Sequence, residues 1–412
     1  MDQCVNHLQT LLHICEGPLG CYLHLFAQQL TEQGYARYSV HLKLRLVAHF
    51  SHWLAQQGVT LHDLTPEHAQ LYLQHRAHPS STRKGDAAAL STLFDLLRHQ
   101  QLIAATPAAP LITTPVKRLA DEFALYLRQE RALAPTTVTN YLEFVTRFLT
   151  AKFADGEVAL SVLCAADVVA FVQRQAACLH LKRAKLMTTA LRSFLQYARY
   201  RGDISIDLVA AVPTVANWSM ASIPRSLPPV QVELVLAHCN RQTPLGRRDY
   251  AILLLLARLG LRAGEVAALR LEDINWQAGC ISVRGKGSQW SPLPLPADVG
   301  EAIAAYLQDG RPPTTSRSVF VRGRAPAISF RNQLAVLSVV RHALARAGID
   351  APHKGAHQFR HTLATELLRH GASLSEIGEV LRHRSPQTTA IYAKVDLAAL
   401  RTLALPWPGG AR

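Results

Sequence analysis

Six residues in the C-terminal part of the chain have the types and the order that chemistry on a phosphodiester requires. They are Arg262, Lys286, His357, Arg360, His383 and Tyr392. Attack on a phosphodiester places growing negative charge on two non-bridging oxygens, and a planar guanidinium can hold both through parallel hydrogen bonds, which an ammonium cannot do. Arg262 and Arg360 therefore suit the stabilisation of a phosphorane-like transition state. Glu265 can brace Arg262 or complement the dipole of the helix that begins there.

Tyr392 is the candidate nucleophile of this set. A tyrosine hydroxyl has an unperturbed pKa of roughly 10, so it needs a proton acceptor, and His357 is the natural choice. Lys286 lies in a glycine-flanked turn and can protonate the leaving 5′-oxygen, while His383 can donate a hydrogen bond to a phosphate oxygen. Because the arginines supply the positive charge that Mg²⁺ supplies in other phosphoryl-transfer sites, we expect no metal and no cofactor.

Each of these residues also has an ordinary structural interpretation. Taken singly, Arg262 is typical of a protein surface, Lys286 of a solvated turn and Tyr392 of a core. His357 and His361 lie one helical turn apart and could bind a metal, but no acidic residue lies between them and the third ligand is missing. The ordered set of six is what favours catalysis over these separate interpretations.

The set resembles the tyrosine recombinase family of the phage-integrase type. Arg262 and Glu265 lie in ARLGLRAGEVAALR, the H-x-x-R pair of His357 and Arg360 lies in HKGAHQFRHTLATELL, and Tyr392 follows His383 in LRHRSPQTTAIY. The resemblance implies a site-specific recombinase that cleaves and rejoins duplex DNA through a covalent 3′-phosphotyrosine. An integrase, a resolvase and a transposon-encoded recombinase of a mobile element all fit it.

The resemblance also implies how the protein meets its partners. The second and third expected domains, residues 116–212 and 227–405, should form a C-shaped clamp around double-stranded DNA that carries a specific site. Self-association on DNA, as a tetrameric synapse, is implied as well, with room for a second recombinase or an accessory protein. The apolar C-terminal tail could pack onto a neighbouring subunit or onto its own.

Two other functions stay open at this point. A catalytically inactive DNA-binding relative is one, although the complete set of six argues against it. A type IB topoisomerase is the other, since it shares the chemistry without a specific site. The repeated N-terminal helical pattern favours recombination. The H-x-x-R pair favours it too, because topoisomerases more commonly have a lysine at the third position of the catalytic set, where this chain has His357.

The composition agrees with a nucleic-acid partner. The chain has 412 residues, with 49% hydrophobic and 18% charged residues, and a formal net charge of +15, which a polyanion would balance. Its seven cysteines are scattered, without a C-x-x-C pair, which favours a reducing compartment over a disulfide framework or a zinc site. No signal peptide or membrane span is evident, so we expect a cytoplasmic protein.

The sequence predicts a mainly α fold with a small antiparallel β-sheet. Proline-rich breaks near 104–115 and 212–229 separate three expected domains. Residues 1–105 form an extra helical domain that looks like a duplicated core-binding unit, residues 116–212 a core-binding, SAM-like helical DNA-binding domain, and residues 227–405 the catalytic domain. GCISVRGKGSQWSPLPL from Gly279 predicts a β-hairpin, SVFVRG from Ser318 a third strand, and the apolar run from Tyr250 to Leu259 a buried helix.

Basic residues on an amphipathic helix predict contacts with DNA phosphates. Lys182, Arg183, Lys185 and Arg192 lie on the last expected helix of the second domain. Arg83 and Lys84 occupy the corresponding place in the first. Contacts of this kind fix the register of a protein on DNA and do not read its sequence.

Overall fold

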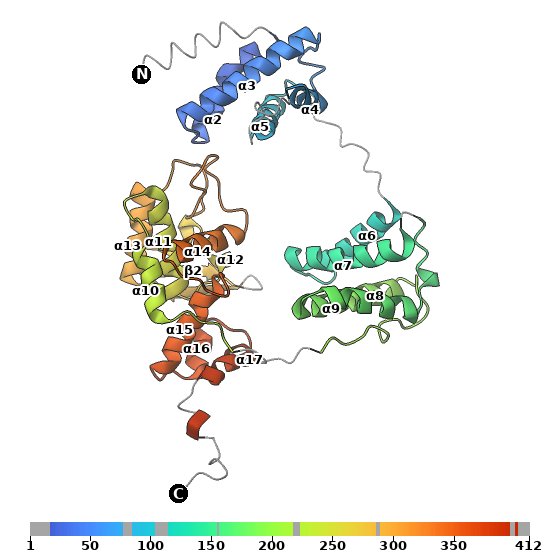
Figure 1. Cartoon of the computed structure of the whole chain (residues 1–412), viewed down its shortest axis with the longest axis vertical. Coiled ribbons are helices and arrows are strands. Elements are labelled where there is room, and N and C mark those ends of the chain that lie inside the picture. The colour runs from blue at the N-terminus through green and yellow to red at the C-terminus, as the bar shows by residue number, and fades with distance from the viewer. Residues whose placement is uncertain are drawn as a thin grey trace. The chain divides into compact units, whose positions relative to one another are not determined.

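The computed structural model describes residues 17–76, 85–103, 114–154, 156–216, 223–285, 289–395 and 400–402. In these ranges the chain is mainly helical, with one three-stranded antiparallel sheet (Figure 1), as the sequence predicts. The chain divides into two compact units, Thr106–Ala221 and the remainder made of Met1–Ala105 with Ser222–Arg412. Both divisions fall at or near the predicted proline-rich breaks. No helix in the described ranges is long and apolar enough to cross a membrane.

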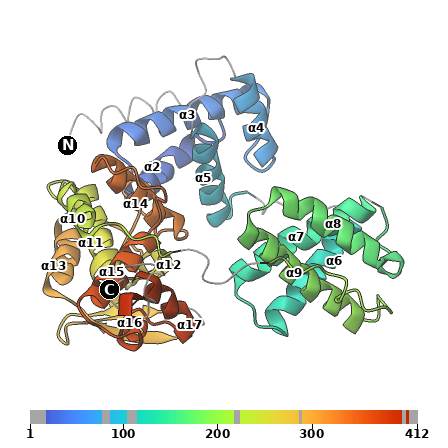
Figure 2. The same cartoon turned by 60° about the horizontal axis from the view of Figure 1, so that its bottom comes forward.

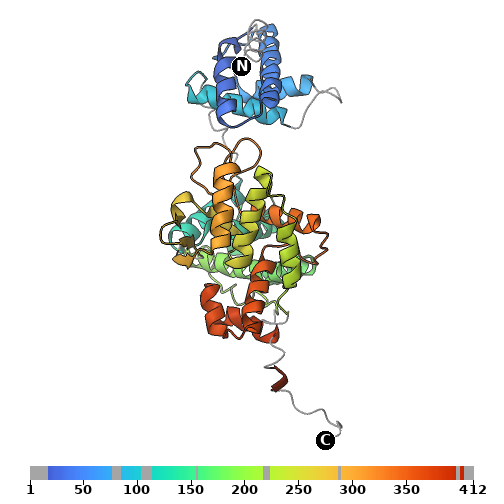
Figure 3. The same ribbon diagram turned by 90° about the vertical axis from the view of Figure 1, so that its left-hand side faces the viewer.

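The N-terminal helices pack around an aromatic centre. They are η1 (Gly20–Tyr22), α2 (Leu23–Glu32), α3 (Arg37–Gln56), α4 (Pro66–His75) and α5 (Asp86–His99), drawn in blue in Figure 3. Phe50 of α3 is fully buried and its ring centroid lies 5.0 Å from that of Tyr72 in α4. Helix α4 begins at Pro66 after Thr65, whose backbone N–H donates to Nδ1 of His68 at 3.1 Å, and proline suits the first position of a helix.

The helices of the second unit build a separate core. They are α6 (Pro115–Gln129), α7 (Pro135–Phe153), η2 (Leu160–Val162), α8 (Ala165–Cys178) and α9 (Leu181–Tyr200). Phe123, Phe144, Phe148 and Phe194 are each at most 1% exposed in its hydrophobic cluster. The order of helices follows that of the first segment, as expected from the sequence, and a common origin of the two stays a prediction.

The third segment surrounds a leucine-rich helix. Its elements are α10 (Pro229–Ala237), α11 (Pro244–Arg258), α12 (Ala263–Ala268), η3 (Leu271–Asp273), β1 (Ile274–Asn275), β2 (Cys280–Arg284), β3 (Trp290–Pro294), α13 (Ala297–Asp309), α14 (Leu334–Arg346), α15 (His357–Arg369), α16 (Leu374–Val380), α17 (Pro386–Thr389) and η4 (Ala390–Val395). Helix α11 contains most of the run predicted as a buried helix, and its residues Leu253, Leu254, Leu255 and Leu256 are at most 1% exposed.

The sheet confirms the predicted hairpin and corrects the predicted third strand. Strands β2 and β3 pair antiparallel, with Ile281 opposite Leu293. The third strand is β1, next to β2, and the strand predicted from Ser318 is wrong, because that segment makes only isolated bridges. Val319, Phe320 and Val321 are fully buried, so their apolar character serves the core without a ladder of strand hydrogen bonds.

Candidate active site

Helix α15 carries three residues of the candidate site and is anchored to the chain that precedes α10. His357 is its first residue, Arg360 lies at the end of the first turn, and His361 begins the second turn. The hydroxyl of Thr362 donates to the carbonyl of Leu227 and accepts from the backbone N–H of the same residue, both at 2.9 Å. Figures 1 and 2 both show α15, α16 and α17 as one group, and η4 contacts all three helices.

Arg360 joins two loops of the site. Its side chain is buried, with Nη1 donating to the carbonyl of Gly260 and Nη2 to the carbonyl of Leu381. Gly260 has a φ of +57°, and a Cβ at this position would approach the Cδ2 atoms of Leu363 and Leu381 at 3.0 Å. The loop before Arg262 can pass this close to α15 because Gly260 has no side chain and tolerates a left-handed backbone.

Arg262 and Glu265 form the start of α12. The Glu265 carboxylate accepts from the backbone N–H of Arg262 at 2.8 Å and from its Nη1 at 2.7 Å. The Glu265 side chain is only 5% exposed, whereas that of Arg262 is 32% exposed. Glu265 therefore holds both the backbone and the guanidinium of Arg262, which is the bracing role that the sequence allowed.

Arg382 is a second partner of Glu265, which the sequence did not predict. Its Nη2 donates to Glu265 Oε2 at 3.1 Å, and both side chains are nearly buried. Arg382 follows α16 with a φ of +55°; its N–H donates to Glu379 and that of His383 to Gly378, the pairing of a Schellman motif. Glycine is favoured at this place, since the left-handed conformation costs other residues about 1–2 kcal/mol.

Tyr392 lies in an apolar pocket with one polar partner. The residue is 1% exposed and packs in a small hydrophobic cluster with Ala364, Ile377 and Leu381. Its hydroxyl lies 2.9 Å from Nδ1 of His361. Burial raises the pKa of Tyr392 to about 12, so the hydroxyl keeps its proton at neutral pH in the free protein.

His361 is neutral at physiological pH. Burial, and then the neighbouring His357 and Arg360, lower the pKa of His361 to about 4. A neutral imidazole with its proton on Nε2 accepts a hydrogen bond at Nδ1, so His361 can accept the proton of the Tyr392 hydroxyl. The ring centroids of His357 and His361 are 5.7 Å apart. The histidine that contacts the Tyr392 hydroxyl is His361. The role of proton acceptor that the sequence suggested for His357 stays a prediction.

His383 is oriented by a buried threonine. Its Nδ1 lies 2.8 Å from Oγ1 of Thr389, which is 2% exposed. Burial, and then Arg360 and Arg262, lower the pKa of His383 to about 4, so the ring is neutral at pH 7. When Thr389 donates to Nδ1, the proton of the ring is on Nε2, which can then donate to a phosphate oxygen.

Positive charge is concentrated at this site. Burial, and then Arg262 and Arg382, lower the pKa of Arg360 to about 10, which leaves it charged at neutral pH. Burial, partly offset by Glu265, also lowers the pKa of Arg382. Such a group of cations is unfavourable by itself and is stabilised by an anion, as a phosphate would supply.

Four of the six predicted residues are therefore neighbours. Arg262, Arg360, His383 and Tyr392 lie close enough for the charges of the two arginines to shift pKa values within the group. Lys286 lies outside the described residues, as do Arg83 and Lys84. From the sequence, His361 was considered only as a metal ligand together with His357, and Arg382 and Thr389 were assigned no role in the site. The position of His361 directly after Arg360 could have drawn attention to it in the sequence. Its contact with Tyr392, however, depends on where η4 packs against α15.

The basic residues of α9 divide into two kinds. Arg183 pairs with Glu143 at 2.7 Å and lies over the ring of Phe144, and Nη2 of Arg192 donates to the carbonyl of Val212 at 2.8 Å. These two arginines have partners within their own domain. Lys182 and Lys185 are exposed. The expected DNA contacts are best supported for the two lysines and stay predictions for all four.

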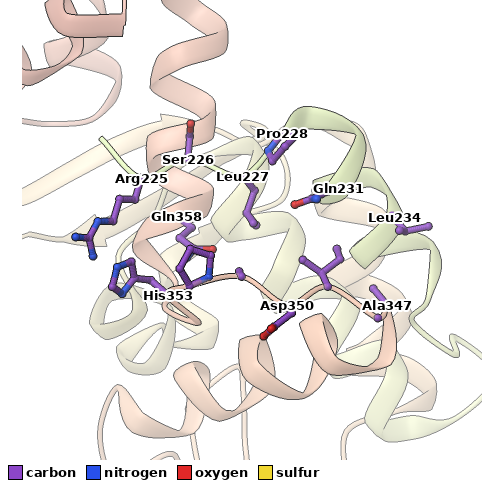
Figure 4. A pocket seen from close by; sticks show the side chains of 14 residues that line it. Arg225, Ser226, Leu227, Pro228, Gln231, Leu234, Ala347, Asp350, His353 and Gln358 are labelled. Atoms are coloured by element: carbon purple, nitrogen blue, oxygen red, sulfur yellow. The ribbon is translucent and has the colours of Figure 1, made fainter. Parts of the chain in front are cut away.

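A pocket lies beside α15 but outside the candidate active site. It has a volume of about 430 Å³ and is lined by residues that include Arg225, His353 and Gln358 (Figure 4). None of the described catalytic candidates lines it. The described part of the chain also contains no group of three or more His, Cys, Asp or Glu that could hold a metal ion.

Comparisons with known proteins place these features in context. The profile of the "Phage integrase family" matches residues 225–398, and that of the "Phage integrase, N-terminal SAM-like domain" matches residues 120–202. Residues 1–105 lie outside both matches. The putative integrase/recombinase y4rA of Sinorhizobium fredii strain NGR234 is 52% identical over 397 residues, 96% of this chain and 96% of the relative.

Shorter relatives and solved structures that are similar to this chain are also recombinases and integrases. The tyrosine recombinase XerD of Ralstonia nicotianae is 30% identical, covering 72% of this chain and 94% of that protein. XerH bound to a palindromic difH substrate, in a post-cleavage complex, matches with a TM-score of 0.54 and 18% identity, over 71% of this chain and 97% of XerH. A lambda integrase dimer on a COC′ core site matches with a TM-score of 0.52 and 15% identity, over 80% and 92%. The likeness to these two structures concerns the fold.

Proposed function

The chain belongs to the phage integrase family and is a tyrosine-type site-specific DNA recombinase, and we propose that Tyr392 forms its covalent bond to DNA. The observation that carries this assignment is the position of the Tyr392 hydroxyl, 2.9 Å from a neutral histidine and beside the charge of Arg360. A nucleophile, its proton acceptor and a cation for the phosphate are thus neighbours.

The proposed step is an in-line displacement at phosphorus. The Tyr392 oxygen forms a bond to the phosphorus while the bond to the 5′-oxygen of the next nucleotide breaks, which leaves a 3′-phosphotyrosine and a free 5′-hydroxyl. The tyrosine proton passes to Nδ1 of His361, because that atom is within hydrogen-bonding distance. The leaving 5′-oxygen takes a proton from Lys286, a role that rests on the family resemblance. Attack by another strand's 5′-hydroxyl reverses the step and rejoins DNA.

Arg262 and Arg360 stabilise the charge that develops on the phosphate. Glu265 holds the Arg262 guanidinium, and the two loop carbonyls hold that of Arg360, so neither side chain has to reorganise during the reaction. His383, held by Thr389, donates a further hydrogen bond. Fixed donors of this kind increase the rate because they interact more strongly with the transition state, which carries more negative charge than the bound phosphodiester.

Duplex DNA with a specific site is the proposed substrate, and self-association on DNA the proposed assembly. The net charge of +15 supports a polyanionic partner. Among the solved structures with a similar fold is a lambda integrase tetramer bound to a Holliday junction, at a TM-score of 0.51 and 16% identity. By analogy, we propose that four copies of the present chain assemble as a tetrameric synapse on DNA. We also propose that the protein is encoded by a mobile element. An accessory protein or a second recombinase fits the same proposal.

Covalent trapping tests the proposed function. A duplex recovered by binding from a random-sequence pool is nicked near the mapped cleavage position, so that the released fragment diffuses away and the adduct accumulates. In EDTA, the unmodified protein should form an adduct on a denaturing gel, while Tyr392→Phe should bind the duplex and form none. An adduct of equal yield with Tyr392→Phe would overturn the assignment, and strict dependence on Mg²⁺ would overturn the charge role of the arginines.

A further inference from the structure

Arg382 occupies a position for which the local backbone gives no reason to choose arginine. It directly follows the C-cap of α16 and has a φ of +55°, at the step of a Schellman motif where glycine is favoured. A residue other than glycine in a strained backbone conformation often lies at a functional site, where its side chain makes a contact that offsets the strain.

The Arg382 guanidinium is buried at the candidate active site and only partly satisfied. Its side chain is 11% exposed, and Nη2 donates to Glu265 Oε2 at 3.1 Å. The Nε and Nη1 atoms are buried and have no hydrogen-bond partner among the described residues. A buried cation with unused donors is unfavourable unless an anion lies nearby, and one carboxylate is already shared with Arg262.

The charges of the site explain why a third arginine is useful. Glu265 is needed to hold Arg262, yet its negative charge cancels one of the two arginines that face the phosphate. Arg382 pairs with the other oxygen of the same carboxylate, so Arg262, Arg360 and Arg382 together with Glu265 leave two net positive charges. A phosphodiester carries one negative charge, and its phosphorane-like transition state carries about two.

We propose that Arg382 is a positioning residue of this active site, which fixes Glu265 and restores the positive charge that Glu265 removes. The proposal rests on the recombinase function proposed above and adds a third arginine to its electrostatics. Arg382 acts through Glu265 and through its field, because its one resolved polar contact is with that carboxylate. Its effect should therefore depend on the charge of the scissile phosphate, which a merely structural role would not.

Three substitutions separate charge from folding. Arg382→Gln removes the charge and keeps most of the side chain, Arg382→Gly also releases the left-handed strain, and Arg382→Lys keeps a charge without the planar fork. Arg369→Gln is the matched control, since it removes one charge from α15 at a side chain that is 63% exposed. Urea unfolding should show no loss of stability for Arg382→Gly, so a loss of cleavage by this variant would not be a loss of fold.

The decisive comparison uses the nicked duplex selected above, with either the natural phosphate or a neutral methylphosphonate at the cleavage position. On the phosphodiester, we expect Arg382→Gln and Arg382→Gly to cleave about 100-fold more slowly than the unmodified protein, and Arg382→Lys to lose less. On the methylphosphonate, whose transition state carries less charge, the loss should shrink to less than about 10-fold. Arg369→Gln should match the unmodified protein on both.

Two results would overturn the inference alone. One is cleavage of the phosphodiester by Arg382→Gln at the rate of the unmodified protein. The other is an equal fold-loss on both substrates, which would make Arg382 a structural residue. If the unmodified protein forms no adduct with any selected duplex, the proposed function itself is overturned, and the inference with it.

Discussion

The Nδ1 atom of His361 lies 2.9 Å from the hydroxyl oxygen of Tyr392. Tyr392 is buried and His361 is half-buried, and their rings meet edge to face with centroids 5.7 Å apart. The contact links the second turn of α15 to η4, so the nucleophile is placed by the helix that also carries Arg360. It is the structural relationship on which the proposed chemistry depends most.

Replacement of His361 should slow cleavage without abolishing DNA binding. We expect His361→Gln to cleave about 100-fold more slowly, because a positioned proton acceptor contributes about 10²–10⁴ to such rates. His370→Gln, an exposed histidine at the end of the same helix, should have no effect. Single-turnover cleavage and gel-shift binding measure the two quantities. A normal rate for His361→Gln together with a slow His357→Gln would return the acceptor role to His357.

Acid should destabilise the folded protein through His361 and His383, two half-buried histidines of the candidate site. The pKa values of His361 and His383 are lowered from 6.5 to about 4 in the folded state. Between these values the unfolded chain binds protons that the folded chain excludes, so the free energy of unfolding falls as the pH drops from 6.5 towards 4.

The double variant His361→Gln/His383→Gln should therefore lose less stability between pH 7 and pH 5 than the unmodified protein. Urea unfolding at both pH values measures this difference, and His370→Gln is the control. An identical loss of stability in the double variant would mean that neither histidine has a lowered pKa in the folded protein.

Gly260 should tolerate alanine less well than another glycine with a similar backbone. Gly260 and Gly348 have φ values of +57° and +67°, but only at Gly260 would a Cβ meet neighbouring side chains. Gly348→Ala should cost about 1 kcal/mol of unfolding free energy, and Gly260→Ala at least about 1 kcal/mol more. Gly260→Ala should also slow cleavage, since the Gly260 carbonyl holds Arg360. Equal unfolding midpoints for the two variants would contradict this description of the loop.

The two exposed lysines of α9 should contribute to DNA affinity. For Lys182→Ala/Lys185→Ala, we expect the slope of log affinity against log salt to flatten by about 0.9 for each lost phosphate contact, with unchanged stability. Arg192→Ala should instead lower stability, because it loses the bonds to the backbone after α9. Lys117→Ala, at an exposed lysine of the same domain, serves as the control. An unchanged slope in the double variant would place α9 away from the DNA.

Local sequence patterns predicted most of the elements and failed where tertiary packing decides. The hairpin of β2 and β3 and the buried helix α11 follow from alternation, turn residues and a run of leucines. The strand predicted from Ser318 has the same β-prone composition, but it is enclosed by the core rather than paired in the sheet. Burial alone accounts for such apolar residues. Composition therefore cannot distinguish a strand that pairs in the sheet from an apolar segment that is only buried in the core.

The candidate site was predictable as far as residue type and spacing reach. Arg262, Arg360, His383 and Tyr392 were found because their chemistry and order together are distinctive. The partner of Tyr392 was not, because His357 and His361 lie on one face of α15 and only the packing of η4 selects between them. Arg382 was missed for another reason, since its place after α16 is one where the backbone favours glycine.

The most direct test of the account is to identify the residue that becomes attached to DNA. The covalent adduct with the nicked duplex would be digested with a protease and a nuclease, and the peptide that carries the nucleotide sequenced by mass spectrometry. The account predicts a single modified peptide, with the phosphate on the oxygen of Tyr392. Attachment to any other residue, or to several residues in comparable amounts, would contradict it.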